Sequence, residues 1–284
     1  MSVIMKGSEV AAAMKERLQK EAVALKERGI LPHLAIVRVG ARPDDLAYER
    51  GAKKRMDIIG IACTVFQFPE DIEKKLFEQE FKKINDNPDI HGILLFRPLP
   101  KDFNEDPLKA MINPLKDVDS MSPVNIAKVF SGDDSAFAPC TPEAVIEILN
   151  HYNIDLTGKR VTVMGRSMVV GKPLSMLLLK KNATVTICHT RTKELQHRCH
   201  EAEILVAAAG KAKVINELMV GQDAIVVDVG INVDEKGNLC GDVDYEKVVN
   251  KASYITPVPG GVGSVTSSVL AKHVIEAAKQ LNSI

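Results

Sequence analysis

Apolar residues recur along this chain with two spacings, and each spacing predicts a different kind of element. Short continuous apolar runs predict buried strands, and apolar positions three or four residues apart predict helices that pack against them. The predicted strands cover residues 34–39, 61–68, 92–96, 160–165, 183–189, 203–210 and 224–232. The predicted helices cover residues 8–29, 47–59, 70–85, 142–152 and 265–282, and further helices are predicted between the strands 160–165, 183–189 and 203–210. Strands that alternate with helices favour parallel sheets, so we predict an α/β fold.

The length of the chain and a change in its pattern indicate two domains. A single hydrophobic core rarely serves 284 residues. Periodicity fades between residues 101 and 142, where Pro, Asp, Asn and Ser become frequent. We expect the connection between the domains, and much of a ligand-binding cleft, in this segment.

Charge and composition exclude several classes of protein. The 37 basic and 37 acidic residues cancel, so no global charge favours nucleic acid or an anionic membrane. No apolar stretch approaches the roughly 20 residues that span a membrane. The first ten residues also lack the apolar region of a secretory signal. We therefore expect a cytoplasmic protein with neither a nucleic-acid nor a membrane partner.

The cysteines point to reduced thiols. Five cysteines, an odd and scattered set, do not form a disulfide framework. Cys188 and Cys199 lie close to three histidines in the sequence, but the spacing is not the paired spacing of zinc ligands. We expect no metal site.

The turn after the predicted strand 160–165 has the features of a phosphate-binding site. Gly165, Arg166 and Ser167 follow the apolar run VTVM, and Gly171 precedes an apolar helix. Backbone N–H groups at such a turn, together with the dipole of the following helix, attract phosphate, so we predict a dinucleotide here. Ser167 occupies the place of the second glycine in the G-x-G-x-x-G pattern, and a plain strand-to-helix turn is the alternative interpretation.

The next strand indicates which dinucleotide binds. It leads into Thr190 and Arg191, with no carboxylate to accept the ribose hydroxyls as in NAD-binding proteins. Arginine attracts the 2′-phosphate that a carboxylate would repel, so we predict NADP as the cofactor. The alternative is that Arg166 and Arg191 only face the solvent.

Two further segments are expected near the cofactor. Ile231 lies near the end of the last predicted strand, at the carboxyl edge where open α/β sheets bind ligands. The loop 256–263, TPVPGGVG, combines prolines that fix φ with glycines that let a flat ligand approach the backbone. We predict that this loop lies against the nicotinamide ring, and a rigid turn is the alternative.

Eight segments of the chain resemble the methylenetetrahydrofolate dehydrogenase/cyclohydrolase family in order and spacing. They are the helix around Tyr48 and the strings HGILLFRPLP, KDVDS, PCTPEAV, GRSMVVGKPLS, ATVTICHTRT, VVDVGIN and YITPVPGGVG. The resemblance implies NADP-dependent oxidation of 5,10-methylenetetrahydrofolate to 5,10-methenyltetrahydrofolate. In many members of the family the product is then hydrolysed to 10-formyltetrahydrofolate in the same cleft.

The resemblance also implies a layout and a set of site residues. The layout is a folate-binding catalytic domain formed by residues 1–118 with 266–284, a Rossmann-like NADP-binding domain at 119–265, a cleft between them, and a homodimer. Tyr48 is expected to stack on the folate rings and Asp119 to bind the pterin amino group, as the two catalytic residues. The other expected substrate-binding residues are Pro259, Gly260 and Gly261. The expected cofactor-binding residues are Gly165, Arg166, Ser167, Thr190, Arg191 and Ile231.

Four positions depart from the family pattern. Ala52 stands where a lysine is usual and Phe96 where a glutamine is usual. Ser120 and Ser264 replace a glycine and a proline. Hydride transfer mainly requires positioning, whereas hydrolysis requires groups that move protons. We therefore predict a dehydrogenase with weak or absent cyclohydrolase activity.

Three alternatives remain open. A fully bifunctional enzyme would need Arg97 or Lys53 to replace the usual lysine, and Lys53 points about 100° away from that position on the helix. A non-catalytic protein that binds folate and NADP would have kept the fold without the chemistry. An unrelated Rossmann dehydrogenase of hydroxy acids or alcohols would need an acid–base His, Lys or Tyr, which 224–232 and 256–263 lack.

Overall fold

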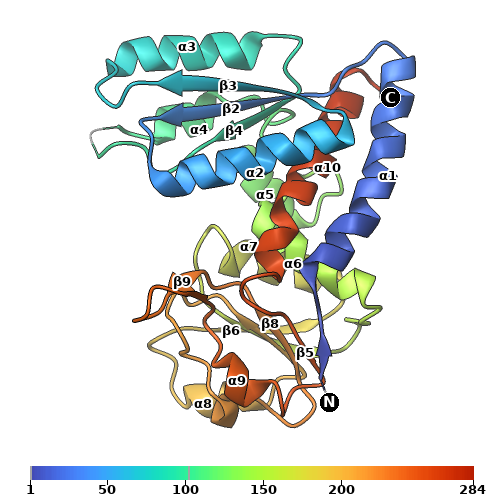
Figure 1. The fold of residues 1–284 in the computed structure, drawn as a ribbon, viewed down its shortest axis with the longest axis vertical. Coiled ribbons are helices and arrows are strands. Elements are labelled where there is room, and N and C mark those ends of the chain that lie inside the picture. The colour runs from blue at the N-terminus through green and yellow to red at the C-terminus, as the bar shows by residue number, and fades with distance from the viewer. Residues whose placement is uncertain (1, 102) are drawn as a thin grey trace. The chain divides into compact units, whose positions relative to one another are not determined.

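The computed structural model describes residues 2–101 and 103–284, and the chain folds as two compact units (Figure 1). Unit 1 consists of Met1–Ala12 and Thr141–Thr266, and unit 2 consists of Ala13–Cys140 and Ser267–Ile284. Each change of unit falls within or at the end of a helix. These helices are α1 (Gly7–Glu27), α6 (Cys140–His151) and α10 (Thr266–Leu281).

Unit 2 is built on a parallel three-stranded sheet with the order β3-β2-β4. Its strands are β2 (His33–Val39), β3 (Ala62–Phe68) and β4 (Gly92–Leu95), and its connecting helices are α2 (Pro43–Ile59) and α3 (Lys74–Asp86). Val37 and Leu95 point from one face of the sheet into a core with Phe77 and Phe81 of α3. α2 covers the opposite face (Figure 1), toward which Arg38 points because side chains alternate along a strand.

The segment 101–142 holds two short helices that its composition did not predict, α4 (Asp106–Met111) and α5 (Pro123–Ser131). Oγ of Ser122 caps α5 by accepting a hydrogen bond from the N–H of Asn125 at 3.1 Å. The contacts of this segment assign it to unit 2 up to Cys140, whereas the resemblance implied a domain boundary at residue 119.

Unit 1 is built on a six-stranded sheet with the order β1-β11-β8-β7-β5-β6, in which all paired strands are parallel. The strands are β1 (Val3–Ile4), β5 (Arg160–Met164), β6 (Thr184–Cys188), β7 (Ile204–Ala207), β8 (Ile225–Asp228) and β11 (Tyr254–Ile255). The apolar pattern did not predict β1. It pairs with β11 through Val3 and Tyr254, so residues from opposite ends of the chain form one edge of the sheet.

Short elements complete unit 1. They are α7 (Gly171–Lys180), α8 (Leu195–His200), α9 (Tyr245–Val248), the 3₁₀ helices η1 (Glu217–Met219) and η2 (Val262–Ser264), and the antiparallel pair β9 (Asn232–Val233) and β10 (Leu239–Cys240). Cys199, Met219 and Val248 from these elements belong to one core with Leu205 and Val226 of the sheet. The predicted α/β fold with parallel sheets is confirmed. Among the described helices, none is long and apolar enough to cross a membrane.

Candidate functional site

The turn between β5 and α7 is shaped by two glycines. Gly165 has a φ of 145°, a conformation that L side chains rarely adopt, and a Cβ there would collide with the carbonyl oxygen of Ala208. A Cβ on Gly171 would collide with the carbonyl oxygen of Gly165, so the first turn of α7 lies directly against the loop. Oγ of Ser167 accepts a hydrogen bond from the N–H of Val170 at 3.1 Å. The loop therefore forms a tight backbone cradle at the start of a helix, which suits a phosphate group.

Basic residues lie beside this cradle. The N–H of Gly165 donates to the carbonyl oxygen of Cys188 at 2.9 Å, which joins the cradle to the end of β6. Arg166, Thr190 and Arg191 are exposed at the carboxyl ends of these two adjacent strands. No carboxylate occurs between Cys188 and Lys193 in the sequence. This local chemistry favours a ligand with an additional phosphate.

A cavity of about 140 Å³ opens at the carboxyl end of β8. Gly230 and Ile231 line one side, and the loop from Pro257 to Ser264 lines the other. The peptide bond before Pro259 is cis, and Gly260 has a φ of 100°. The structure therefore brings together two of the segments that the sequence analysis predicted to contact one ligand.

Two buried aspartates, which sequence analysis missed, support this cavity. The carboxylate of Asp228 accepts hydrogen bonds from the N–H groups of Gly230, Asp242 and Val243 at 2.9, 3.0 and 2.9 Å. Burial raises the pKa of Asp228 to about 6, against the opposing effect of these backbone hydrogen bonds. Asp242 accepts from the backbone at residues 209–211. In the sequence, the signal for Asp228 was a carboxylate at the end of an apolar run.

Tyr48 lies on α2, which begins with Pro43 and two acidic residues that favour a helix N-terminus. Tyr48 is 37% exposed, and its ring meets that of Phe96 edge-on with centroids 5.8 Å apart. Ala52, one turn further along α2, is 1% exposed, and Phe96 is 7% exposed. The two positions at which the resemblance leads one to expect a lysine and a glutamine are thus buried and apolar.

Asp119 lies near the carboxyl end of β4. The segment that contains it runs parallel to this strand through the pair Ile93 and Asp117. Oδ1 of Asp119 accepts a hydrogen bond from the N–H of Cys140 at 2.9 Å. Burial raises the pKa of Asp119, whereas the Cys140 N–H and the charge of Arg97 lower it. Since Phe96 follows β4 directly, the structure brings Tyr48 and Asp119 to the same edge of unit 2.

The two residues considered as replacements for the lysine lie in different surroundings. Arg97 is close enough to Asp119 for its charge to lower the pKa of that carboxyl group. Lys53 is exposed. Burial raises the pKa of the Cys63 thiol on β3 to about 11, and the positive charge of Lys53 opposes this rise. Within residues 2–101 and 103–284, no three His, Cys, Asp or Glu side chains gather as metal ligands would.

Comparison with known proteins gives matches over nearly the whole chain. Residues 5–119 match the catalytic domain of the tetrahydrofolate dehydrogenase/cyclohydrolase family, and residues 139–282 match its NAD(P)-binding domain. A relative named bifunctional protein FolD, from Clostridioides difficile, is 58% identical over 98% of this chain and 97% of its own length.

Two solved structures are also similar. The bifunctional methylenetetrahydrofolate dehydrogenase/cyclohydrolase of Campylobacter jejuni has a TM-score of 0.96 and 38% identity, and the match covers 99% of each chain. The Trypanosoma brucei dehydrogenase-cyclohydrolase, solved with NADP and an inhibitor, has a TM-score of 0.92 and 32% identity, with 98% of each chain covered.

Proposed function

This chain belongs to the tetrahydrofolate dehydrogenase/cyclohydrolase family, and we propose that it oxidises 5,10-methylenetetrahydrofolate with NADP⁺ and then hydrolyses the methenyl product. One observation carries the proposal: the same chain has the glycine cradle at Gly165 in unit 1, and Tyr48 and Asp119 at one edge of unit 2. Relatives 49% to 58% identical are named bifunctional proteins, which favours the alternative with two activities over a dehydrogenase alone.

The residues of unit 1 fit a bound NADP. The backbone at Gly165, Arg166 and Ser167 would hold the pyrophosphate, since Gly165 and Gly171 let this loop pack closely against the start of α7. The side chains of Arg166, Thr190 and Arg191 would hold the 2′-phosphate. Ile231 would lie beside the nicotinamide, and the cofactor when bound supplies a hydride acceptor.

The residues of unit 2 fit a pterin. The partly exposed ring of Tyr48 offers a flat apolar face for stacking. The Asp119 carboxylate would accept the two N–H bonds of a 2-amino-pyrimidinone edge, while the N–H of Cys140 fixes its orientation. We also assign Pro259, Gly260 and Gly261 of unit 1 to substrate binding, as the resemblance implies.

The first reaction does not require the protein to act as an acid or a base. The methylene carbon loses a hydride, and the bridge between N5 and N10 becomes a cationic amidinium. No proton moves to or from a side chain, so catalysis depends on holding the reacting carbon in place. The apolar side chains of Ala52 and Phe96 are compatible with this step.

The second reaction is more demanding. Water adds to the methenyl carbon, the bond from that carbon to N5 breaks, and one proton is released as 10-formyltetrahydrofolate forms. A group that accepts and returns protons accelerates such a step, and neither Ala52 nor Phe96 can act in this way. We therefore propose that hydrolysis is the slower of the two activities.

A single assay tests the proposal. Methylenetetrahydrofolate is mixed with the enzyme and NADP⁺ or NAD⁺, and absorbance reports NADPH and the methenyl product together. We expect NADPH to form faster than NADH, and the methenyl product to rise and then decay faster than without enzyme. Methenyl product that decays only at the uncatalysed rate would restore the dehydrogenase-only alternative. If neither NADP⁺ nor NAD⁺ is reduced, the alternative of a non-catalytic protein that binds folate and NADP would be favoured.

We further propose that the enzyme assembles as a homodimer, as the resemblance implies. Light scattering coupled to size-exclusion chromatography measures the mass of the assembly directly. We expect twice the mass of one chain, and the mass of a single chain would reject the dimer.

A further inference from the structure

A buried arginine lies at the carboxyl end of β2, on the face of the unit 2 sheet that α2 covers. Arg38 is 5% exposed, and its neighbours Val37 and Val39 point the other way, into the core formed with α3. A guanidinium keeps its charge under all conditions in which a protein is folded, so its burial requires hydrogen-bond acceptors around it.

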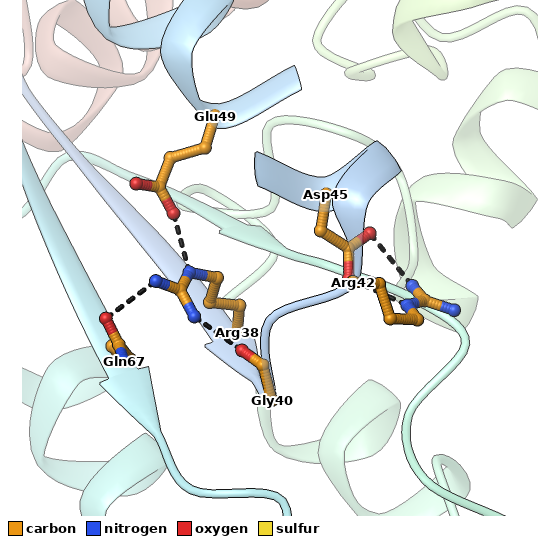
Figure 2. Close-up of polar contacts among 6 residues, drawn as sticks. All are labelled: Arg38, Gly40, Arg42, Asp45, Glu49 and Gln67. Atoms are coloured by element: carbon orange, nitrogen blue, oxygen red, sulfur yellow. Dashed lines mark hydrogen bonds and ion pairs between the residues drawn. The ribbon is translucent and has the colours of Figure 1, made fainter. Parts of the chain in front are cut away.

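Three acceptors hold the guanidinium, and each belongs to a different segment, as Figure 2 shows. Nε of Arg38 donates to Oε2 of Glu49 on α2 at 2.7 Å. Nη2 donates to Oε1 of Gln67 on β3 at 2.6 Å, and Nη1 donates to the carbonyl oxygen of Gly40 in the loop before α2. One side chain therefore joins two strands, a loop and the beginning of a helix.

Glu49 connects this cluster to Tyr48, which precedes it on α2. The ring of Tyr48 contacts Phe96, and the N–H of Phe96 donates to the carbonyl oxygen of Val37 at 2.9 Å. Phe96, directly after β4, thus lies beside the end of β2 that carries Arg38. Tyr48 is partly exposed, and since α2 carries its ring, a shift of α2 moves the ring.

We propose that Arg38 and Glu49 are positioning residues for the folate site. Their ion pair fixes the first turns of α2 on the sheet and thereby fixes the ring of Tyr48. This inference rests on the proposed function, in which Tyr48 stacks on the folate rings. Stacking requires the aromatic ring to meet the flat face of its ligand, so displacement of the ring on loss of the pair weakens folate binding. The cofactor residues of unit 1 take no part in the cluster.

A second ion pair on the same helix provides a matched control. Nε and Nη2 of Arg42 donate to the Asp45 carboxylate at 2.8 and 2.9 Å, at the start of α2 (Figure 2). The two residues are three positions apart, and the Arg42 side chain is 44% exposed. D45N removes the charge from an ion pair at the start of α2 and leaves the bond between Arg38 and Glu49 in place.

Steady-state kinetics of the full-length enzyme give the first test. We expect E49Q to raise KM for methylenetetrahydrofolate about tenfold, with KM for NADP⁺ changed less than about twofold. R38K keeps the charge but lacks the planar fork that serves three acceptors, so it should behave like E49Q. D45N should behave like the unaltered enzyme.

A double substitution controls for misfolding. E49Q leaves a buried guanidinium without its carboxylate, whereas R38M/E49M removes both charges and retains apolar stems. The double variant should show the same selective rise in KM for the folate substrate. Equal changes in the KM values for folate and NADP⁺ would overturn the positioning role. An unchanged folate KM in E49Q, R38K and R38M/E49M would also overturn it.

A second measurement requires no turnover. The chain contains no tryptophan, so Y48W introduces a single indole at the site. Its fluorescence anisotropy should fall when E49Q is added and stay constant when D45N is added, because only E49Q weakens the contact between α2 and the sheet. Constant anisotropy in Y48W/E49Q would refute the positioning role. A failure of the unaltered enzyme to reduce NADP⁺ would instead refute the proposed function.

Discussion

The backbone N–H of Cys140 donates a hydrogen bond of 2.9 Å to Oδ1 of Asp119, across twenty-one positions of the chain. Asp119 is therefore oriented by the backbone of the first residue of α6. A carboxylate held in this way can present its remaining acceptor capacity to a ligand, since each carboxylate oxygen has two lone pairs.

Asp119→Asn should weaken folate recognition selectively. The amide oxygen can still accept from Cys140, but the amide NH₂ would then meet the N–H donors of the pterin edge. An unpaired donor of this kind costs about 2–3 kcal/mol, which is a fall of about 30- to 150-fold in kcat/KM for the folate substrate. KM for NADP⁺ serves as the internal control. A parallel change in both substrates would argue against direct contact with the pterin.

Ala52→Lys should accelerate hydrolysis of the methenyl product. The substitution introduces an ionisable amine one helical turn after Tyr48, where the present residue is buried and apolar. A positioned acid–base group typically contributes at least about a hundredfold, and we expect at least a tenfold gain in this unadapted site. A52M adds similar volume without a charge. Equal hydrolysis rates in A52K and A52M would show that the amine has no role.

Arg191→Ala should lower the preference for NADP⁺. Loss of a hydrogen bond to a charged phosphate costs about 1.5–3 kcal/mol, which is a factor of about 10 to 150 in kcat/KM for NADP⁺. The same parameter for NAD⁺ should not change. Lys193, exposed two residues further on, gives the control K193A. If both cofactors lost activity equally, Arg191 would not contact the 2′-phosphate.

Ser120→Gly should stabilise the protein. Ser120 has a φ of 56°, a left-handed conformation that costs a residue with a Cβ roughly 1–2 kcal/mol. Its buried Oγ also has no hydrogen-bond partner among the described residues. Glycine removes both costs but increases the entropy of the unfolded chain, so we expect a net gain of about 1 kcal/mol. Thermal unfolding should show a higher Tm, and a lower Tm would contradict the strain.

His91→Gln should flatten the pH dependence of stability. Burial lowers the pKa of His91 from its ordinary value of 6.5; His33 and Lys116 lower it further, and Asp89 opposes them. Below about pH 6.5, His91 therefore binds a proton more readily in the unfolded chain than in the folded chain. Its contribution makes the folded state less stable as the pH falls through this range. H91Q should reduce the loss of Tm between pH 7 and pH 5. The exposed His151 gives the control H151Q, and equal slopes in all three proteins would exclude this effect.

The sequence predicted most strands because a buried parallel strand leaves a continuous apolar run. β1 escaped prediction because two residues are too short for a pattern, and its partner β11 lies about 250 positions away. α5 escaped because its start depends on the cap at Ser122 rather than on periodicity.

The tight turn at Gly165 was predictable because its requirement is local. The strained backbone of Gly165 and its close approach to Ala208 require glycine, and that requirement is visible in the sequence. Arg38 gave no such signal, because its role depends on Glu49 and Gln67, which lie 11 and 29 positions away. Asp228 likewise acquires its role only when the backbone near residue 242 folds around it.

Transfer of deuterium from labelled substrate tests the central claim most directly. Methylenetetrahydrofolate with two deuterium atoms on the methylene carbon is incubated with the enzyme and NADP⁺, and mass spectrometry measures the reduced cofactor. We expect one deuterium in each reduced nicotinamide, because the hydride moves directly from the methylene carbon. Reduced cofactor without deuterium, or no reduced cofactor at all, would contradict a methylenetetrahydrofolate dehydrogenase.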